Sequence, residues 1–367
     1  MPLGRVRKSL RNTFFSYLER MWQTDDARKI AANALQGLLN GHPREAISGL
    51  TDMKSPYPEL GQAGSNRNPA NGRRAIIITA RFRTGSTLLW NLFRNMDGIT
   101  AYYEPFNERR WFDSALRGNQ VDSTHRGVSD YWREYDRLPE LANYYREEWA
   151  YRNLFMDANF WNPRMKRFLE LLIEKAPGRP VLQFNRIDFR LPWIRHHFPR
   201  ASVVHLYRNP RDQWCSSLMD PRCVPADATM SEFREHDKFY LASWAADLKY
   251  QFPFLDERTI SHPYELFYYI WKLSYLFGIK YAHHSLSFEE LVEQPEKVLT
   301  ELFQTVDIDG RQLEKSRNLV TEVNVGQWRE YAEDSWFKRY ETACETALTE
   351  FLDAPVSGSD SGAAADF

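Results

Sequence analysis

Two segments of the sequence place arginine and hydroxyl side chains directly after short β-prone runs. In the first, residues 75–80 (AIIITA) lead into Arg83, Gly85, Ser86 and Thr87, and apolar residues at helical spacing follow. A strand, a tight turn and a helix in this order aim backbone N–H groups and hydroxyls at one point on the positive end of the helix. The segment therefore predicts an anion-binding site. The alternative is that Ser86 and Thr87 only cap the helix.

The second segment repeats this arrangement. Residues 202–207 (SVVHLY) predict a buried strand that runs into Arg208, a turn containing Pro210, and a helix that carries Ser216. The spacing from Arg208 to Ser216 lets both side chains meet one phosphate across the turn. Two anion sites at the ends of two strands indicate one ligand with phosphates at both ends.

Four motifs in this order resemble those of sulfotransferases. Residues 83–87 (RTGST) resemble the loop that binds the 5′-phosphosulfate, and residues 208–216 resemble the 3′-phosphate motif with the same Arg-to-Ser spacing. Residues 286–292 (LSFEELV), followed by Pro295, are similar to the family's YEDL…P segment, and residues 325–331 (VGQWREY) to its late G-x-W-x-x-Y loop. The form RTGSTLL is closer to bacterial and carbohydrate sulfotransferases than to the cytosolic phenol and steroid branch, which usually has Lys in place of Arg83.

The resemblance covers about residues 76–331 and implies a reaction. A sulfuryl group would move from 3′-phosphoadenosine 5′-phosphosulfate (PAPS) to an acceptor hydroxyl, on a carbohydrate or glycoconjugate, without a metal. Arg83 would neutralise the leaving oxygen and Glu104 would take the acceptor's proton. The implied donor site consists of Arg83, Thr84, Gly85, Ser86, Thr87, Leu88, Arg208, Ser216, Gln327 and Trp328.

Glu104 follows a predicted strand at residues 100–103 and would face the crevice in which open α/β sheets bind ligands. In carbohydrate and bacterial sulfotransferases a Glu in this setting is the proposed base; the alternative is a surface Glu at a turn. The cytosolic branch carries a Lys and its His base after the third strand. Here Arg186 stands in that region and no His follows directly, which favours Glu104. His196 and His197 have the pattern of helix-end residues.

Two other classes of function stay open. A P-loop kinase is disfavoured because the Walker A pattern needs a further Gly and a Lys, and no acidic Mg²⁺ ligand stands out. A non-catalytic nucleotide- or carbohydrate-binding protein on the same fold is disfavoured because Arg83, Glu104 and Arg208 are all present. The acceptor itself, and the choice between O- and N-sulfation, are not determined by the sequence.

The composition of the sequence limits the class of protein and the cellular compartment that we expect. The net charge of −1 argues against a nucleic-acid binder that relies on bulk positive charge. Three cysteines without paired spacing fit a reducing compartment. No apolar run has the length of a membrane span, and the N-terminus lacks the apolar core of a signal peptide. We therefore expect a cytoplasmic enzyme.

The predicted fold is a P-loop-like, three-layer α/β domain with a central, mostly parallel sheet of about five strands and helices on both faces. Strands are predicted at residues 76–80, 100–103, 181–185, 203–207 and 286–288, and helices at 88–96, 165–174, 233–250 and 262–277, the last ended by Gly278. The domain would span residues 75–353, with an acceptor-side insertion at 109–162. Residues 1–50 would form a helical extension that contacts a membrane surface or, with greater weight, its own domain or a second subunit. Residues 51–74 would form a linker and 354–367 a disordered tail.

Overall fold

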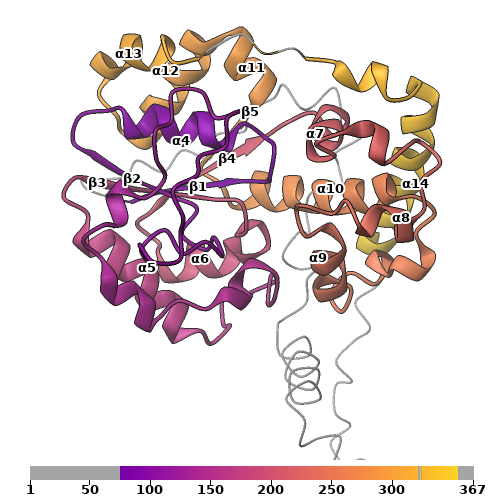
Figure 1. The fold of residues 1–367 in the computed structure, drawn as a ribbon, viewed down its shortest axis with the longest axis horizontal. Helices are drawn as coiled ribbons and strands as arrows, with labels where there is room; N and C mark the ends of the chain where they lie inside the picture. The colour runs from indigo at the N-terminus through magenta and orange to yellow at the C-terminus, as the bar shows by residue number, and fades with distance from the viewer. Residues whose placement is uncertain (1–74, 321–322, 324, 354–367) are drawn as a thin grey trace, which may run out of the picture. The chain divides into compact units, whose positions relative to one another are not determined.

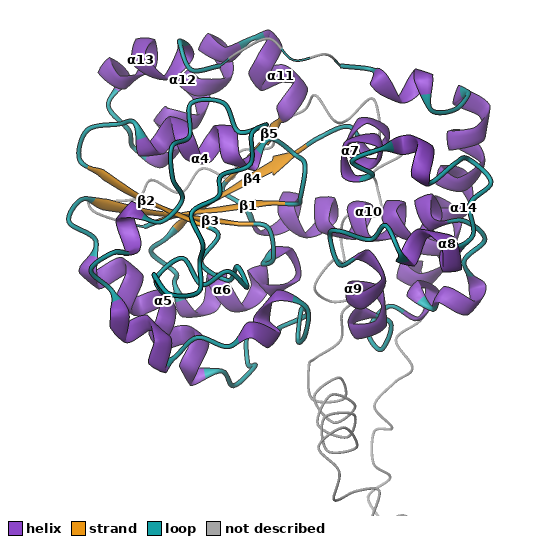
Figure 2. Cartoon of the chain, viewed as in Figure 1, coloured by secondary structure: helices purple, strands orange, loops and turns teal. Residues whose placement is uncertain are grey.

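The computed structural model describes residues 75–320, 323 and 325–353. Its centre is a five-stranded sheet in the order β2-β3-β1-β4-β5, with every neighbouring pair parallel (Figure 1, Figure 2). The strands are β1 (Ile76–Ala80), β2 (Ile99–Tyr103), β3 (Arg179–Phe184), β4 (Ser202–Tyr207) and β5 (His284–Ser287). The five predicted strands and the α/β fold class are confirmed. The predicted N-terminal extension, linker and tail lie outside the described residues.

β1 occupies the middle of the sheet because all its side chains are apolar or small enough to be covered on both faces. Ile77 is 1% exposed and pairs with Leu182 of β3 on one side and Val203 of β4 on the other. Strands of parallel sheets are typically continuous apolar runs, since helices cover both faces. Figure 1 shows α4, α11, α12 and α13 on one side of the sheet and α5 and α6 on the other.

The α-helices have the following bounds. They are α4 (Ser86–Arg94), α5 (Pro163–Lys175), α6 (Leu191–His197), α7 (Pro210–Ser217), α8 (Met230–Arg234), α9 (Leu241–Leu248), α10 (Pro263–Tyr281), α11 (Phe288–Glu293), α12 (Pro295–Val306), α13 (Leu313–Arg317) and α14 (Asp334–Asp353). His196 and His197 lie in the last turn of α6, as predicted.

The single helix predicted at residues 233–250 is wrong. The structure divides this region into α8 and α9, with Tyr240 between them in the left-handed conformation at φ 62°. The carboxylate of Asp237 accepts hydrogen bonds from the backbone N–H groups of Leu241 and Ala242, at 2.9 Å each. A carboxylate in this position satisfies N–H groups that a helix start leaves unpaired, so a new helix begins at Leu241.

The predicted end of α10 at Gly278 is also wrong, because the helix continues to Tyr281. A Cβ atom on Gly278 would lie 2.3 Å from the imidazole ring of His205 in β4. The glycine is therefore required for the close approach of α10 to the sheet, and it does not act as a helix terminator.

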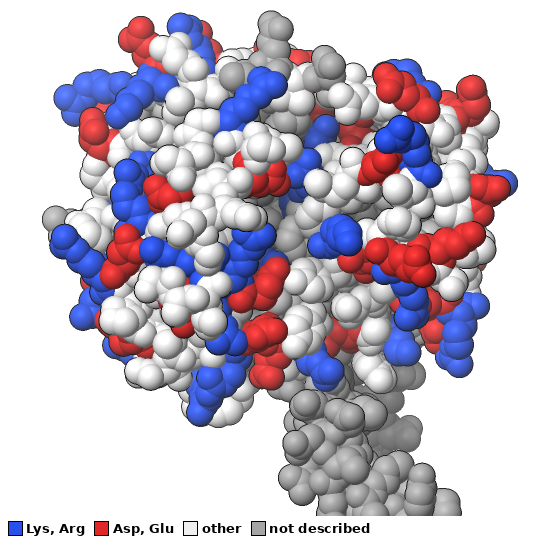
Figure 3. All heavy atoms as spheres, viewed as in Figure 1, with Lys and Arg blue, Asp and Glu red and all other residues white. Residues whose placement is uncertain are grey.

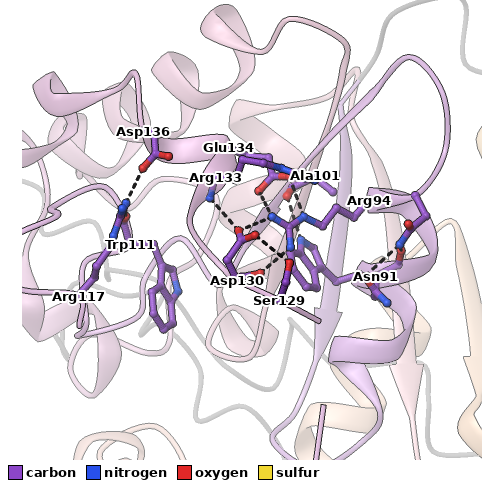
Figure 4. Close-up of polar contacts among 12 residues, drawn as sticks. Asn91, Arg94, Ala101, Trp111, Arg117, Ser129, Asp130, Arg133, Glu134 and Asp136 are labelled. Atoms are coloured by element: carbon purple, nitrogen blue, oxygen red, sulfur yellow. Dashed lines mark hydrogen bonds and ion pairs between the residues drawn. The ribbon is translucent and has the colours of Figure 1, made fainter. Parts of the chain in front are cut away.

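Between β2 and α5 the chain forms three short 3-10 helices, η1 (Arg133–Tyr135), η2 (Pro139–Asn143) and η3 (Glu147–Ala150). Arg94, at the end of α4, binds this segment through Asp130 and Glu134, with its Nε atom 2.8 Å from a Glu134 oxygen (Figure 4). The Arg94 side chain is 5% exposed and also lies over the Trp90 ring. The ion pairs therefore attach the 109–162 segment to the helix that follows β1.

Candidate active site

A cavity of about 940 Å³ lies where the strands of the sheet end. Its wall includes the first residue after each of four strands, namely Glu104 after β2, Asn185 after β3, Arg208 after β4 and Phe288 at the end of β5, together with Phe82 and Arg83 after β1. Open α/β sheets bind ligands outside the carboxyl ends of their strands. The five strands thus converge on one candidate site.

The loop after β1 is sharply bent around Gly85, which is the N-cap residue of α4 at φ 85°. A Cβ atom on Gly85 would lie 2.3 Å from the Phe288 ring, so only glycine fits there. No side chain caps α4, which does not support the alternative that Ser86 and Thr87 act as simple caps. Instead, Ser86, Thr87 and Leu88 line the cavity together with Gly85. The start of α4 therefore faces the cavity, as the predicted anion site requires.

Arg83 connects this loop to the segment after β4. Its Nε atom donates to the hydroxyl of Ser216 at 3.1 Å, and Arg208 Nη1 donates to the Arg83 carbonyl at 3.0 Å. The Arg208 guanidinium lies 4.9 Å from the centre of the Phe288 ring. Burial lowers the pKa of Arg208 from its usual value, while Glu289 and Asp212 oppose that shift. The structure thus joins the two predicted phosphate segments in one cavity wall.

Glu104 lies in that wall with φ 39° and is 5% exposed. Its carboxylate accepts hydrogen bonds from Asn107 Nδ2 at 2.7 Å, Asn185 Nδ2 at 2.6 Å and Arg186 Nη1 at 2.7 Å. The cation that pairs with Glu104 is therefore Arg186, which also binds Glu108 through Nη2 at 2.7 Å. These contacts hold the carboxylate in one orientation at the edge of the cavity.

Two of the predicted donor-site residues, Thr84 and Trp328, do not line the cavity. The hydroxyl of Thr84 donates to the Arg81 carbonyl at 2.7 Å and is buried within the loop. Trp328 packs under Arg211, whose guanidinium carbon lies 4.6 Å from the centre of the ring. Its neighbour Gln327 does line the cavity.

The segment that carries Gln327 is fastened by Asp212 of α7. The Asp212 carboxylate accepts hydrogen bonds from the backbone N–H of Gly326 at 2.7 Å and of Trp328 at 3.2 Å. Gly326 has φ 84° and precedes η9 (Gln327–Glu330). The Asp212 contacts hold the late loop against the helix that follows Arg208.

Comparison with known proteins identifies the family. The sulfotransferase family model matches residues 75–312. The chain belongs to the sulfotransferase family. Its described residues form an α/β fold with an all-parallel sheet, and no curated protein sequence matches the chain.

Several solved sulfotransferase structures are similar to this chain. One from Mycobacterium avium has 14% identity and a TM-score of 0.42, over 81% of this chain and 79% of that one. One from Alicyclobacillus acidocaldarius has 13% identity and a TM-score of 0.34, over 77% and 96%. The sulfotransferase domain from the curacin biosynthetic pathway has 14% identity and a TM-score of 0.34, over 75% and 98%. Identities this low say nothing about the acceptor.

Sequence reasoning missed several residues in the cavity wall of this sulfotransferase. They are Tyr103, Asp122, Thr124, His125, Arg126, Asn185, Lys238 and Phe239. Four of these come from the 109–162 segment. Their place in the cavity could not be predicted from the spacing of residues, because it depends on contacts with residues far away in the sequence. Tyr103 and Asn185 lie at the ends of predicted strands, and this position could have identified them as residues near the ligand site.

Surface charge, potential metal ligands and the apolar length of the helices further characterise the described part of the chain. Lys and Arg are interspersed with Asp and Glu on the face drawn in Figure 3. Among the described residues, no group of three or more His, Cys, Asp or Glu side chains is arranged to hold a metal ion. None of the helices in the described part of the chain is long and apolar enough to cross a membrane.

Proposed function

We propose that this sulfotransferase transfers the sulfuryl group of PAPS to a hydroxyl of a carbohydrate or glycoconjugate. The observation that carries the proposal is that both predicted phosphate segments line one cavity, joined by the hydrogen bond from Arg83 to Ser216. A cavity of about 940 Å³ has the size of a site for a nucleotide-sized ligand. A ligand with phosphates at both ends would contact the loop after β1 and the residues after β4 together.

In the proposed reaction, the bond between sulfur and the bridging oxygen of the 5′-phosphate breaks as a bond from sulfur to the acceptor oxygen forms. Negative charge develops on the bridging oxygen, and Arg83 stabilises it there. The acceptor's proton passes to Glu104, and adenosine 3′,5′-bisphosphate leaves. As in phosphoryl transfer, such a reaction depends on positioning and electrostatics.

The choice of Glu104 as the base rests on its surroundings. Arg186, Asn107 and Asn185 orient its carboxylate at the cavity edge, as described above. A positioned carboxylate within reach of the acceptor hydroxyl can act as a general base.

The remaining cavity wall supports a polar acceptor. Arg126 and Lys238 have no ion-pair partner among the described residues and can bind anionic or hydroxyl groups. Phe239 offers a half-buried aromatic ring in the same cavity wall. An aromatic face among hydrogen-bonding side chains suits a sugar ring, which has apolar and polar surfaces.

The test is an acceptor screen with radiolabelled PAPS and polysaccharides, glycolipids and small hydroxylated metabolites. Labelled product together with release of adenosine 3′,5′-bisphosphate supports the proposal. ATP, tested as the donor in parallel, addresses the kinase alternative. Tight nucleotide binding without transfer to any acceptor would instead favour the non-catalytic alternative.

A further inference from the structure

His125 lies in the cavity wall on the 109–162 segment, next to Thr87 at the start of α4. Its Nε2 atom is 3.2 Å from the Thr87 hydroxyl oxygen, and its Nδ1 atom contacts the Tyr131 hydroxyl. Thr87 also contacts the hydroxyl of Tyr103 at 3.0 Å. The imidazole therefore touches the same loop that would hold the 5′-phosphosulfate.

The neighbours of Tyr131 determine which nitrogen of His125 carries the hydrogen. The Tyr131 hydroxyl oxygen accepts a hydrogen bond from the backbone N–H of Asp122 at 3.0 Å. Its own hydrogen has one acceptor among the described residues, the Nδ1 atom of His125. Because Tyr131 donates to Nδ1, the neutral imidazole carries its hydrogen on Nε2. His125 thus presents an N–H donor to the cavity.

Packing holds this donor in place. The Tyr131 ring stacks on Tyr103, with 4.5 Å between ring centres and 17° between ring planes. Arg94 fastens Asp130, directly before Tyr131, to α4. Figure 4 shows the Arg94 side chain reaching from α4 to Asp130 and Glu134. A hydrogen-bond donor that is fixed before the ligand arrives needs no reorganisation during the reaction.

The charge state of the ring follows from its surroundings. Burial lowers the pKa of His125 from its usual value, and the positive charge of Arg83 lowers it further. Asp122 and Glu104 act in the opposite direction without reversing the shift. Tyr131, whose pKa is raised to about 12 by burial, stays protonated. His125 is therefore neutral near pH 7.

We propose that His125 is a catalytic residue that donates a hydrogen bond from Nε2 to a sulfo oxygen of the bound donor. The inference rests on the proposed function. When Thr87 turns its hydroxyl to the 5′-phosphate, the His125 N–H becomes available to the group attached to that phosphate. The ring is unsuited to be the base, because its free electron pair is on Nδ1 and is occupied by Tyr131. His125 keeps its hydrogen, and Glu104 receives the acceptor's proton.

The test compares two nucleotides that differ in the sulfo group. PAPS and adenosine 3′,5′-bisphosphate are titrated into wild type, His125→Ala and His125→Gln by calorimetry. Turnover is measured with an acceptor from the screen, or as slow hydrolysis of PAPS. His125→Ala should lower turnover about 100-fold, the loss expected when a reacting group is no longer held in line with the attacking atom. It should bind PAPS less tightly and leave binding of the bisphosphate unchanged.

His125→Gln supplies an amide N–H near the position of Nε2 and should recover most of the lost turnover. The matched control is His196→Ala, an exposed histidine on α6 outside the cavity wall, which should behave as wild type. Equal losses for both nucleotides in His125→Ala would mean a structural role and overturn the inference, as would turnover at the native rate.

If His125→Ala does not fold, NMR spectra of the wild-type protein with nitrogen-labelled histidine provide the test instead. The His125 Nε2 resonance should move on addition of PAPS and much less with the bisphosphate. An identical response to both nucleotides overturns the inference and leaves the proposed function standing. Failure of wild type to bind either nucleotide overturns both.

Discussion

The Nη1 atom of Arg186 lies 2.7 Å from Oε2 of Glu104, and the two side chains are 3% and 6% exposed. A buried carboxylate and guanidinium lose much of their hydration, so the pair persists only with good geometry and further hydrogen bonds. Asn107 and Asn185 supply those bonds to Glu104. The pair fixes the carboxylate at the end of β2, beside the loop that carries Arg83.

Replacement of Glu104 tests the proposed base. Glu104→Gln keeps the shape of the side chain and an oxygen that can accept from Arg186, so fold and donor binding should be retained. Turnover on an acceptor hydroxyl should fall about 100-fold or more, because the amide cannot take the proton. Steady-state kinetics with PAPS and a screened acceptor, beside calorimetric binding of the donor, measures both quantities.

Glu108→Gln is the matched control, because Glu108 binds the other nitrogen of Arg186 but does not line the cavity. It should keep most of the turnover. Arg83→Ala should reduce both donor binding and turnover. If Glu104→Gln reacts at close to the native rate, the proton goes to another group.

Arg208 is expected to distinguish PAPS from nucleotides without a 3′-phosphate. Arg208→Ala should weaken binding of adenosine 3′,5′-bisphosphate by about 2 kcal/mol or more, as for the loss of a charge-assisted hydrogen bond to phosphate. Affinity for adenosine monophosphate should hardly change. Calorimetric titration of both ligands gives the two values.

Arg222→Ala serves as the control for Arg208, because Arg222 is an exposed arginine that pairs with Asp220 and does not line the cavity. Its removal should affect neither ligand. Arg208 also donates to the Arg83 carbonyl, so equal losses for both nucleotides would indicate that it acts by shaping the loop.

The strands could be predicted because their signal is local. β1 and β4 are short apolar runs that end directly at polar residues, and parallel strands place those residues at one edge. His125 gave no such signal, since only the fold brings it to Thr87. The spacing of apolar residues also gave no indication of the role of Asp237, whose carboxylate accepts hydrogen bonds from the first N–H groups of α9. α14, with Phe337, Tyr340, Cys344 and Leu348 buried at helical spacing, was missed although its pattern is readable.

A glycine in a helical sequence pattern can mark the end of the helix or a point of close packing, and Gly278 is a point of close packing. We expect Gly278→Ala to lower the free energy of unfolding by about 1–3 kcal/mol, because the added methyl group would overlap the His205 ring. The higher helix propensity of Ala, about 1 kcal/mol, is too small to offset a clash in a packed interior. Urea denaturation gives the difference.

Gly310→Ala is the control for Gly278→Ala, because no atom lies within 4 Å of a Cβ built there. Its effect should stay within about 0.5 kcal/mol. Equal stability of Gly278→Ala and wild type would show that α10 can shift away from β4 at little cost.

His205 should make the fold sensitive to acid. Burial lowers its pKa to about 3, well below the usual value of about 6.5 for an unfolded chain. Between these values the unfolded state binds a proton that the folded state excludes. Stability is therefore retained above about pH 6.5 and falls as the pH drops toward about 3, by up to about 1.4 kcal/mol per pH unit from this histidine. His262 and His283, with pKa values lowered to about 4 by burial, act in the same direction.

The His205→Gln variant isolates the contribution of His205 to this acid sensitivity. It removes the titrating ring, so the slope of unfolding free energy against pH, from urea denaturation between about pH 4.5 and about pH 6, should be shallower than in wild type. Ser285→Ala is the matched control. It deletes the hydroxyl 3.2 Å from His205 Nδ1 but leaves the ring buried, so it should lower stability and keep the wild-type slope. A wild-type slope in His205→Gln would mean that the folded protein accepts a proton at His205, which the packing of this ring against Gly278, Tyr207 and Tyr275 opposes.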